Sequence, residues 1–189
     1  MKPLTGKVAI ITGASAPRGI GCAIAKRLAK DGAAVLITDI DGKFHINGKS
    51  QNRMELLENT ATEIKAAGGQ ADTLTVDVTQ KNDVLQCAEF AKSWFGRIDI
   101  LVNNAGSLAG SDNFLETTPA QWETSFQVNL LGPMMLTQAV IPEMQAVGAG
   151  SIINIGSTGS LGAEAGFGAY TAMKHALIGM TKTIAAEFG

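Results

Sequence analysis

The stretch Val8-Ala-Ile-Ile-Thr-Gly-Ala-Ser-Ala-Pro-Arg-Gly-Ile-Gly21 decides the fold. It opens with a short, continuous apolar run, which is typical of a strand that is covered on both faces in a parallel sheet. Glycines follow, and behind them Ile20, Ile24 and Leu28 recur at helical spacing, which predicts a helix that ends near Gly32. A strand, a glycine-rich turn and a helix in this order predict a phosphate-binding loop, because residues without side chains let a pyrophosphate approach the N–H groups at the start of the helix.

The alternation of strands and helices continues along the chain. Apolar runs predict strands at residues 8–12, 35–38, 74–76, 98–102 and 151–155. Helical patterns between them end at Gly68-Gly69 and at Gly96, and a last helix runs from near Tyr170 to Phe188. We therefore expect an α/β fold: a Rossmann-type, doubly wound parallel sheet with helices on both faces.

The fourth predicted helix lies before the last predicted strand. It opens with Thr118-Pro-Ala-Gln121, a capping box with proline at the first helical position. Trp122, Phe126, Leu130 and Met134 then follow at intervals that place them on one apolar face. The polar segment Asp41–Gln51 is expected to be a surface loop between the second strand and its helix.

Composition narrows the classes of function. The 189 residues are 46% hydrophobic and 17% charged, and the net charge of -2 provides no basic patch for nucleic acid or an anionic membrane. Neither the cysteines (Cys22, Cys87) nor the histidines (His45, His175) have metal-ligand spacing, so we expect no metal site. Because no apolar run approaches the ~20 residues of a membrane span, we expect a cytoplasmic protein with one domain over residues 1–189.

An acidic residue points to an adenine nucleotide. Asp39 closes the second predicted strand, 18 residues after Gly21, where a carboxylate can accept hydrogen bonds from ribose hydroxyls. Arg18, inside the glycine loop, instead provides a guanidinium that can bind a 2′-phosphate. Because Asp39 would repel that phosphate, the sequence favours NAD, with NADP possible through Arg18.

A proton-transfer pair lies near the end of the chain. Tyr170 and Lys174 are four residues apart on a predicted helix and therefore lie on one face, where the ammonium favours the charged phenolate form of the tyrosine. Ser157 follows the last predicted strand at its carboxyl end, where open α/β sheets form their ligand crevice. Its hydroxyl can bond a carbonyl or alkoxide oxygen while Tyr170 gives or takes the proton.

The whole set of motifs resembles the short-chain dehydrogenase/reductase family of the single-domain type. The matching residues occur in the family's order, from near the first residue to near the last: Thr12-Gly…Gly19-Ile-Gly21, Asp39, Asp77-Val78, Asn103-Asn-Ala-Gly106, Asn129, Ile155-Gly-Ser157 and Tyr170-x-x-x-Lys174. The resemblance implies an NAD(H)-dependent oxidoreductase that interconverts a secondary alcohol and a carbonyl compound, with the cofactor supplying the hydride.

The resemblance also implies a role for each matching residue. Tyr170 would be the general acid/base, Lys174 would assist it and bind the nicotinamide ribose, and Ser157 would polarise the carbonyl group. Asn129 would hold a water that relays protons towards Lys174. The residues expected to contact the cofactor are Gly13, Ser15, Arg18, Gly19, Ile20, Asp39, Asp77, Val78, Asn104, Ala105, Gly106, Tyr170 and Lys174.

The sequence departs from the family pattern in two places. Five residues, Ala14 to Arg18, separate Gly13 from Gly19, which makes the first loop longer than usual. The chain also ends at Gly189, where the family usually continues, so we expect a C-terminally incomplete member with its last strand at an exposed edge.

These departures leave alternatives open. They are a non-catalytic dinucleotide-binding protein, a 3-oxoacyl-thioester reductase that uses NADPH, and an epimerase or dehydratase with the same tyrosine and lysine. The helices at residues 119–145 and 170–188 are expected to form a homodimer or homotetramer, and no residue identifies the small-molecule substrate.

Overall fold

Five parallel strands form the central sheet, and a separate two-stranded hairpin lies beside it. The computed structural model describes residues 2–46 and 48–189, without the side chains of His45 and Ile46. The strands are β1 (Val8–Ile11), β2 (Ala34–Asp39), β3 (Lys43–Ile46), β4 (Lys49–Asn52), β5 (Gln70–Thr75), β6 (Ile100–Asn103) and β7 (Ser151–Asn154). The helices are α1 (Ile20–Lys30), α2 (Arg53–Ala66), α3 (Lys81–Phe95), α4 (Pro119–Phe126), η1 (Gln127–Leu131), α5 (Gly132–Ala146), η2 (Thr158–Ser160) and α6 (Gly168–Phe188).

The strand order explains where a ligand crevice forms. The sheet runs β5-β2-β1-β6-β7, so the chain winds outwards from β1 through β2 to β5 and then returns to β6 on the other side of β1. The direction of winding reverses between β1 and β6, and the loops after these two strands diverge at the carboxyl edge of the sheet. The Rossmann-type fold predicted from the alternating pattern is confirmed.

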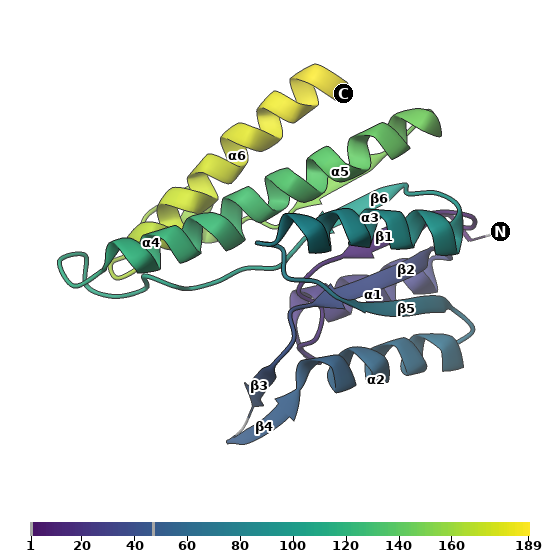
Figure 1. Cartoon of the computed structure of the whole chain (residues 1–189), viewed down its shortest axis with the longest axis horizontal. Coiled ribbons are helices and arrows are strands. Elements are labelled where there is room, and N and C mark those ends of the chain that lie inside the picture. Colours follow the sequence, from purple (N-terminus) through teal and green to yellow (C-terminus); the bar gives the residue numbers. More distant parts are fainter. Residues whose placement is uncertain (1, 47) are drawn as a thin grey trace.

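The continuous apolar runs of the central strands are explained by helices on both faces (Figure 1). Every residue of β1, β2 and β6 is buried. On one face Ala9 and Val35 pack with residues of α1 and α2, such as Ala25 and Leu57. On the other face α3 and α5 form a second core, in which Leu101 lies among the buried residues.

A buried carboxylate fixes the start of β1 beside the start of β6. Asp99 is 4% exposed, and it accepts hydrogen bonds from the backbone N–H of Val8, from Lys7 and from the Arg97 guanidinium. Burial by itself raises the pKa of Asp99, but the hydrogen bonds from Arg97, Lys7 and Val8 outweigh burial and hold this pKa below its ordinary value.

The expectation of a loop at Asp41–Gln51 is wrong. Residues 43–46 and 49–52 pair as antiparallel strands, with Lys43 opposite Asn52 and Ile46 opposite Lys49. The connection contains the Asn47-Gly48 dipeptide, which favours tight hairpins; Asn47 lies outside the described residues, and Gly48 has a φ of 72°. Because the hairpin is mostly polar, its strands lack the apolar alternation that indicated the others.

The helix predicted from Thr118 contains an irregular turn. Thr118 caps α4 through the predicted capping box, but residues 127–131 form a π-helical turn before α5 begins. The extra residue in this turn rotates the helix, so the most buried positions are Ser125, Asn129, Leu136 and Val140. The predicted face of Trp122, Phe126, Leu130 and Met134 is only half-buried.

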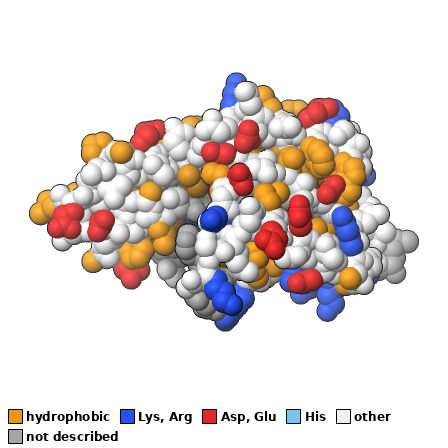
Figure 2. Space-filling view, turned by 60° about the horizontal axis from the view of Figure 1, so that its bottom comes forward, with side chains coloured by type: hydrophobic (Ala, Val, Ile, Leu, Met, Phe, Trp, Pro, Cys, Tyr) orange, Lys and Arg blue, Asp and Glu red, His pale blue; other side chains and the backbone are white. Residues whose placement is uncertain are grey.

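The last strand and the last helix lie at one side of the molecule. β7 pairs only with β6 among the described strands, so its outer edge is open, as expected, and Ile153 is 41% exposed. α6 contacts α4 and η1 and extends away from the sheet (Figure 1). Figure 2 shows hydrophobic and acidic side chains together at the end that carries α4, and hydrophobic, acidic and basic side chains interspersed over the rest of this face. Within the described residues, no helix has the length and apolar character needed to cross a membrane.

Candidate functional site

Two loops from neighbouring strands clamp each other at the carboxyl edge of the sheet. The side chain of Asn104, after β6, donates hydrogen bonds to the carbonyl oxygens of Thr12 and Gly13, at 2.8 and 2.9 Å. In return, the Thr12 hydroxyl accepts hydrogen bonds from the backbone N–H groups of Asn104 and Ala105, each at 3.1 Å. The glycine loop is therefore held rigidly beside the Asn104–Gly106 segment.

Glycine is required at the centre of this clamp. Gly13 has a φ of 66°, and a Cβ at this position would lie 2.7 Å from the Cα of Ala105. The absence of a side chain at Gly13 therefore allows the two loops to approach closely, and Gly13 also lines the cavity described below.

The start of α1 is suited to an anion. Gly19 is its N-cap and provides no side-chain hydrogen bond, and the first turn contains no acidic residue. The N–H groups of this turn and the positive end of the helix dipole are therefore available to a phosphate. Ile20 lies at the cavity and is 62% exposed. Arg18 is exposed and is not among the residues that line the cavity.

Asp39 lies at the end of β2, as predicted, but it already has several partners. Its Oδ2 accepts a hydrogen bond from the N–H of Ser15 at 2.9 Å, and its Oδ1 accepts one from Ile40 N–H at 2.9 Å. The Arg53 guanidinium lies 3.2 Å from Oδ1. Asp39 therefore fixes the glycine loop as well as facing the cavity.

A cavity of about 560 Å³ connects these parts with the tyrosine and lysine. Of the residues predicted to contact a cofactor, the following line it: Gly13, Ser15, Ile20, Asp39, Asp77, Val78, Asn104, Ala105, Gly106, Tyr170 and Lys174. Arg18 and Gly19 do not. Residues from both ends of the chain thus meet in one crevice, and its volume lies within the range of small-molecule sites.

Lys174 is a buried cation in the wall of this cavity. Its ammonium donates a hydrogen bond to the carbonyl oxygen of Ile155 at 2.6 Å and lies 5.7 Å from the centre of the Tyr170 ring. Burial lowers the pKa of Lys174. Among the described residues this carbonyl is its only hydrogen-bond acceptor, although an ammonium has three hydrogens to donate. The remaining hydrogens suit the hydroxyl groups of a bound ribose.

Tyr170 and Ser157 both lie beside Gly159. The Ser157 Oγ and the Cε1 of Tyr170 lie 3.5 and 3.9 Å from the position that a Cβ on Gly159 would occupy. Ser157 Oγ accepts a hydrogen bond from the Gly159 N–H, which leaves its own hydrogen available to donate. Tyr170 is half-buried, and its hydroxyl has no hydrogen-bond partner among the described residues. Ser157 itself is not among the lining residues of the cavity.

Asn129 lies in the π-helical turn and is completely buried. Its amide accepts a hydrogen bond from the Ser107 N–H and donates to the Ser107 carbonyl and to Ser125 Oγ. The side chain therefore fixes the backbone that follows Gly106, beside the cavity. Its role in a proton relay towards Lys174 stays a prediction.

Several residues of the cavity were not predicted from the sequence. Phe44 from the hairpin and Arg53 from the start of α2 line it at the Asp39 end, and Ser107, Leu108 and Val128 line it elsewhere. The available signal for Arg53 was a basic residue at the first position of a helix, where acidic residues are favoured.

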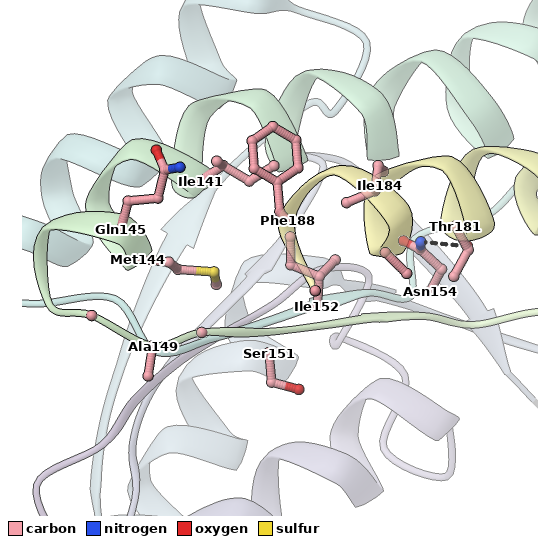
Figure 3. A pocket seen from close by; sticks show the side chains of 14 residues that line it. Ile141, Met144, Gln145, Ala149, Ser151, Ile152, Asn154, Thr181, Ile184 and Phe188 are labelled. Atoms are coloured by element: carbon pink, nitrogen blue, oxygen red, sulfur yellow. Dashed lines mark hydrogen bonds between the residues drawn. The ribbon is translucent and has the colours of Figure 1, made fainter.

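A second cavity, of about 550 Å³, lies between β7, the end of α5 and α6 (Figure 3). Ile141, Met144, Ile152 and Phe188 surround it, and Asn154 donates a hydrogen bond to Thr181 at its side. None of the predicted site residues and no charged side chain lines it. We therefore assign the functional site to the first cavity. The described residues contain no group of three or more acidic, histidine or cysteine side chains that could bind a metal.

Comparison with known proteins agrees with this arrangement. A family model described as short chain dehydrogenase matches residues 7–189. This chain belongs to the short-chain dehydrogenase family. Among its curated relatives, dehydrogenase/reductase SDR family member 4 of Sus scrofa is 32% identical over 98% of this chain and 62% of its own length. Oxidoreductase UcpA of Salmonella typhimurium is 36% identical over 100% of this chain and 66% of its own length.

Two solved structures match the fold of this chain. A metagenomic short-chain oxidoreductase in complex with NADP has a TM-score of 0.86 at 38% identity, over 97% of this chain and 77% of that one. An NAD⁺-bound xylitol dehydrogenase has a TM-score of 0.87 at 28% identity, over 98% of this chain and 66% of that one. This member of the short-chain dehydrogenase family spans 62% to 66% of the length of the two curated relatives named above.

Proposed function

We propose that residues 1–189 form a dinucleotide-binding and catalytic domain that oxidises a secondary alcohol, or reduces the corresponding carbonyl compound, with NAD(H). NADP(H) is possible as the cofactor. The observation that carries the proposal is that Tyr170 and Lys174 line the same cavity as the glycine loop and Asp39. The cofactors bound by the two solved relatives support it.

The residues present fit a dinucleotide. Gly13 and the first turn of α1 would hold the pyrophosphate, and Asp39 would accept a hydrogen bond from the adenosine ribose. Asp77 and Val78, in the wall of the cavity, would border the adenine. Lys174, whose ammonium has hydrogens without acceptors in the described structure, would hold the nicotinamide ribose.

A nicotinamide held beside Tyr170 and Lys174 would supply the hydride-transfer chemistry of the reaction. Tyr170 would give or take the proton at the substrate oxygen, and the Lys174 ammonium lies 5.7 Å from the centre of the tyrosine ring. Ser157 retains a hydroxyl hydrogen for the same oxygen and would stabilise the charge that develops there. Asn129 would act by fixing the Ser107 backbone beside the cavity.

Turnover and binding measured on the same chain test this proposal. We expect NADH to bind with a rise in its fluorescence, and a screen of secondary alcohols and ketones to reveal cofactor-linked turnover that Tyr170→Phe removes. Absence of binding would contradict the proposal.

A second candidate is a protein that binds the cofactor without catalysis, since Ser157 does not line the cavity with Tyr170 and Lys174. Binding without turnover across the screen would favour this candidate.

We also propose that this chain forms a homodimer or homotetramer. The surface would be formed by the helices that the sequence indicated, over residues 119–145 and 170–188. Sedimentation velocity tests this oligomeric state.

A further inference from the structure

A guanidinium lies at the adenosine end of the proposed dinucleotide site. Arg53 Nη1 lies 3.2 Å from both Asp39 Oδ1 and the Ser15 Oγ, and the guanidinium carbon lies 5.2 Å from the centre of the Phe44 ring. Arg53, Phe44, Asp39 and Ser15 all line the cavity. The side chain is 26% exposed, so it is held in place and still accessible from the cavity.

The hydrogen bonds of Arg53 leave most of its donors available. A guanidinium has five N–H donors, and among the described residues only those on Nη1 have acceptors. The Nη2 and Nε hydrogens form the planar fork that binds a phosphate through two parallel hydrogen bonds.

The Asp39 carboxylate beside Arg53 already uses most of its hydrogen-bond acceptor positions. Oδ1 of Asp39 accepts from both Ile40 and Arg53, and Oδ2 accepts from Ser15. An ionised carboxylate has about four acceptor positions, so about one is left for the ribose hydroxyls. The charge that would repel a phosphate group is also paired with Arg53.

The position of Arg53 in its helix indicates a role other than helix stability. It is the first residue of α2, where the helix dipole disfavours a cation. Its backbone N–H donates to the Gly42 carbonyl at 2.9 Å, so the two ends of the hairpin are joined at this residue.

We propose that Arg53, held by Asp39 and Phe44, binds a phosphate at the 2′ position of the adenosine ribose. The chain then accepts the phosphorylated cofactor at least as well as the unphosphorylated one. Arg53 provides this specificity in place of Arg18, which lies outside the cavity lining. Because this role rests on the proposed dinucleotide site, the two must be tested separately.

Calorimetric binding of two cofactor fragments tests the role of Arg53 separately from the proposed dinucleotide site. We expect the wild-type chain to bind 2′,5′-ADP at least as tightly as 5′-AMP. Arg53→Gln should weaken 2′,5′-ADP at least tenfold and change the affinity for 5′-AMP less than threefold, since the two fragments differ only in the 2′-phosphate. Arg27→Gln, which removes an exposed arginine on α1, is the charge-matched control and should change neither affinity.

Each other outcome is informative. Tenfold weaker binding of 2′,5′-ADP than of 5′-AMP by the wild type, equal loss of both ligands in Arg53→Gln, or a selective loss in Arg18→Gln would overturn the role of Arg53. Failure of the wild type to bind either fragment would instead overturn the proposed function. Should Arg53→Gln not fold, Arg53→Lys retains the charge without the fork, and we expect a selective loss of at least threefold; a smaller one would overturn the role.

Discussion

A methyl group at Gly21 should disrupt the glycine loop. Gly21 is the second residue of α1, and a Cβ there would lie 2.5 Å from the Asn104 Nδ2 and 2.8 Å from the carbonyl oxygen of Gly13. Both contacts are shorter than real Cβ contacts, and the second is with backbone. Gly21→Ala must therefore displace Asn104, which clamps Thr12 and Gly13.

The size of the effect follows from three contributions. Loss of the two Asn104 hydrogen bonds costs about 1 kcal/mol each. Overpacking against the Gly13 backbone costs about 1–3 kcal/mol. Alanine is favoured over glycine within a helix by about 1 kcal/mol, which acts in the opposite direction. We expect Gly21→Ala to be less stable than the wild type by about 3 kcal/mol when these contributions are combined.

Urea unfolding followed by circular dichroism measures this difference. The matched control is Gly179→Ala, because Gly179 also lies in a helix and a Cβ there would meet nothing within 4 Å. The control should be stabilised by up to about 1 kcal/mol. The reasoning fails if the two variants change stability in the same direction, because the Asn104 clamp would then not exist as described.

Three further changes give distinct results. Tyr170→Phe should reduce turnover by about 10²–10⁴-fold; its unfolding free energy in urea should stay within about 0.5 kcal/mol of the wild type, because the hydroxyl has no partner among the described residues. Lys174→Met removes an ammonium whose pKa is lowered by burial, so the unfolded chain binds this proton more tightly than the folded one. The unfolding free energy of the wild type relative to this variant should therefore rise as the pH rises towards 10.5. Urea unfolding at pH 7 and at pH 10 measures this difference in free energy, and the same value at both pH values would contradict the prediction. Asp99→Asn should cost about 1–3 kcal/mol at pH 7. Since the pKa of Asp99 is lower in the folded chain, the contribution of its carboxylate to stability is complete above pH 3.8 and is lost as the pH falls further. If wild type and variant still differ in unfolding free energy below the folded pKa, this account of Asp99 is wrong.

The sequence predicted the parts of the fold that follow from local pattern. Val8–Ile11 is a continuous apolar run because both faces of β1 are covered, and Asp39 closes β2 because the chain leaves the sheet there. The polar hairpin had no such pattern, since its pairing depends on the turn at Gly48 and on backbone hydrogen bonds. The π-helical turn at Asn129 depends on tertiary contacts with Ser107 and Ser125.

The candidate site was predictable to a similar extent. Tyr170 and Lys174 share a helix face, so their proximity follows from spacing alone. Arg53 is 14 residues beyond Asp39, and only the hairpin returns it to the end of β2. Arg18 was the arginine expected near a 2′-phosphate, but its place in an exposed part of the loop depends on how residues 14–18 turn, which no periodicity describes.

A crystal structure of the chain with bound NAD(H) would test most directly whether the crevice between β1 and β6 is a nucleotide site. We predict the pyrophosphate at the first turn of α1, the adenosine beside Asp39, and the nicotinamide next to Tyr170 and Lys174. A dinucleotide seated in the groove between β7 and α6, or a nicotinamide remote from Tyr170, would contradict the proposed site and its chemistry.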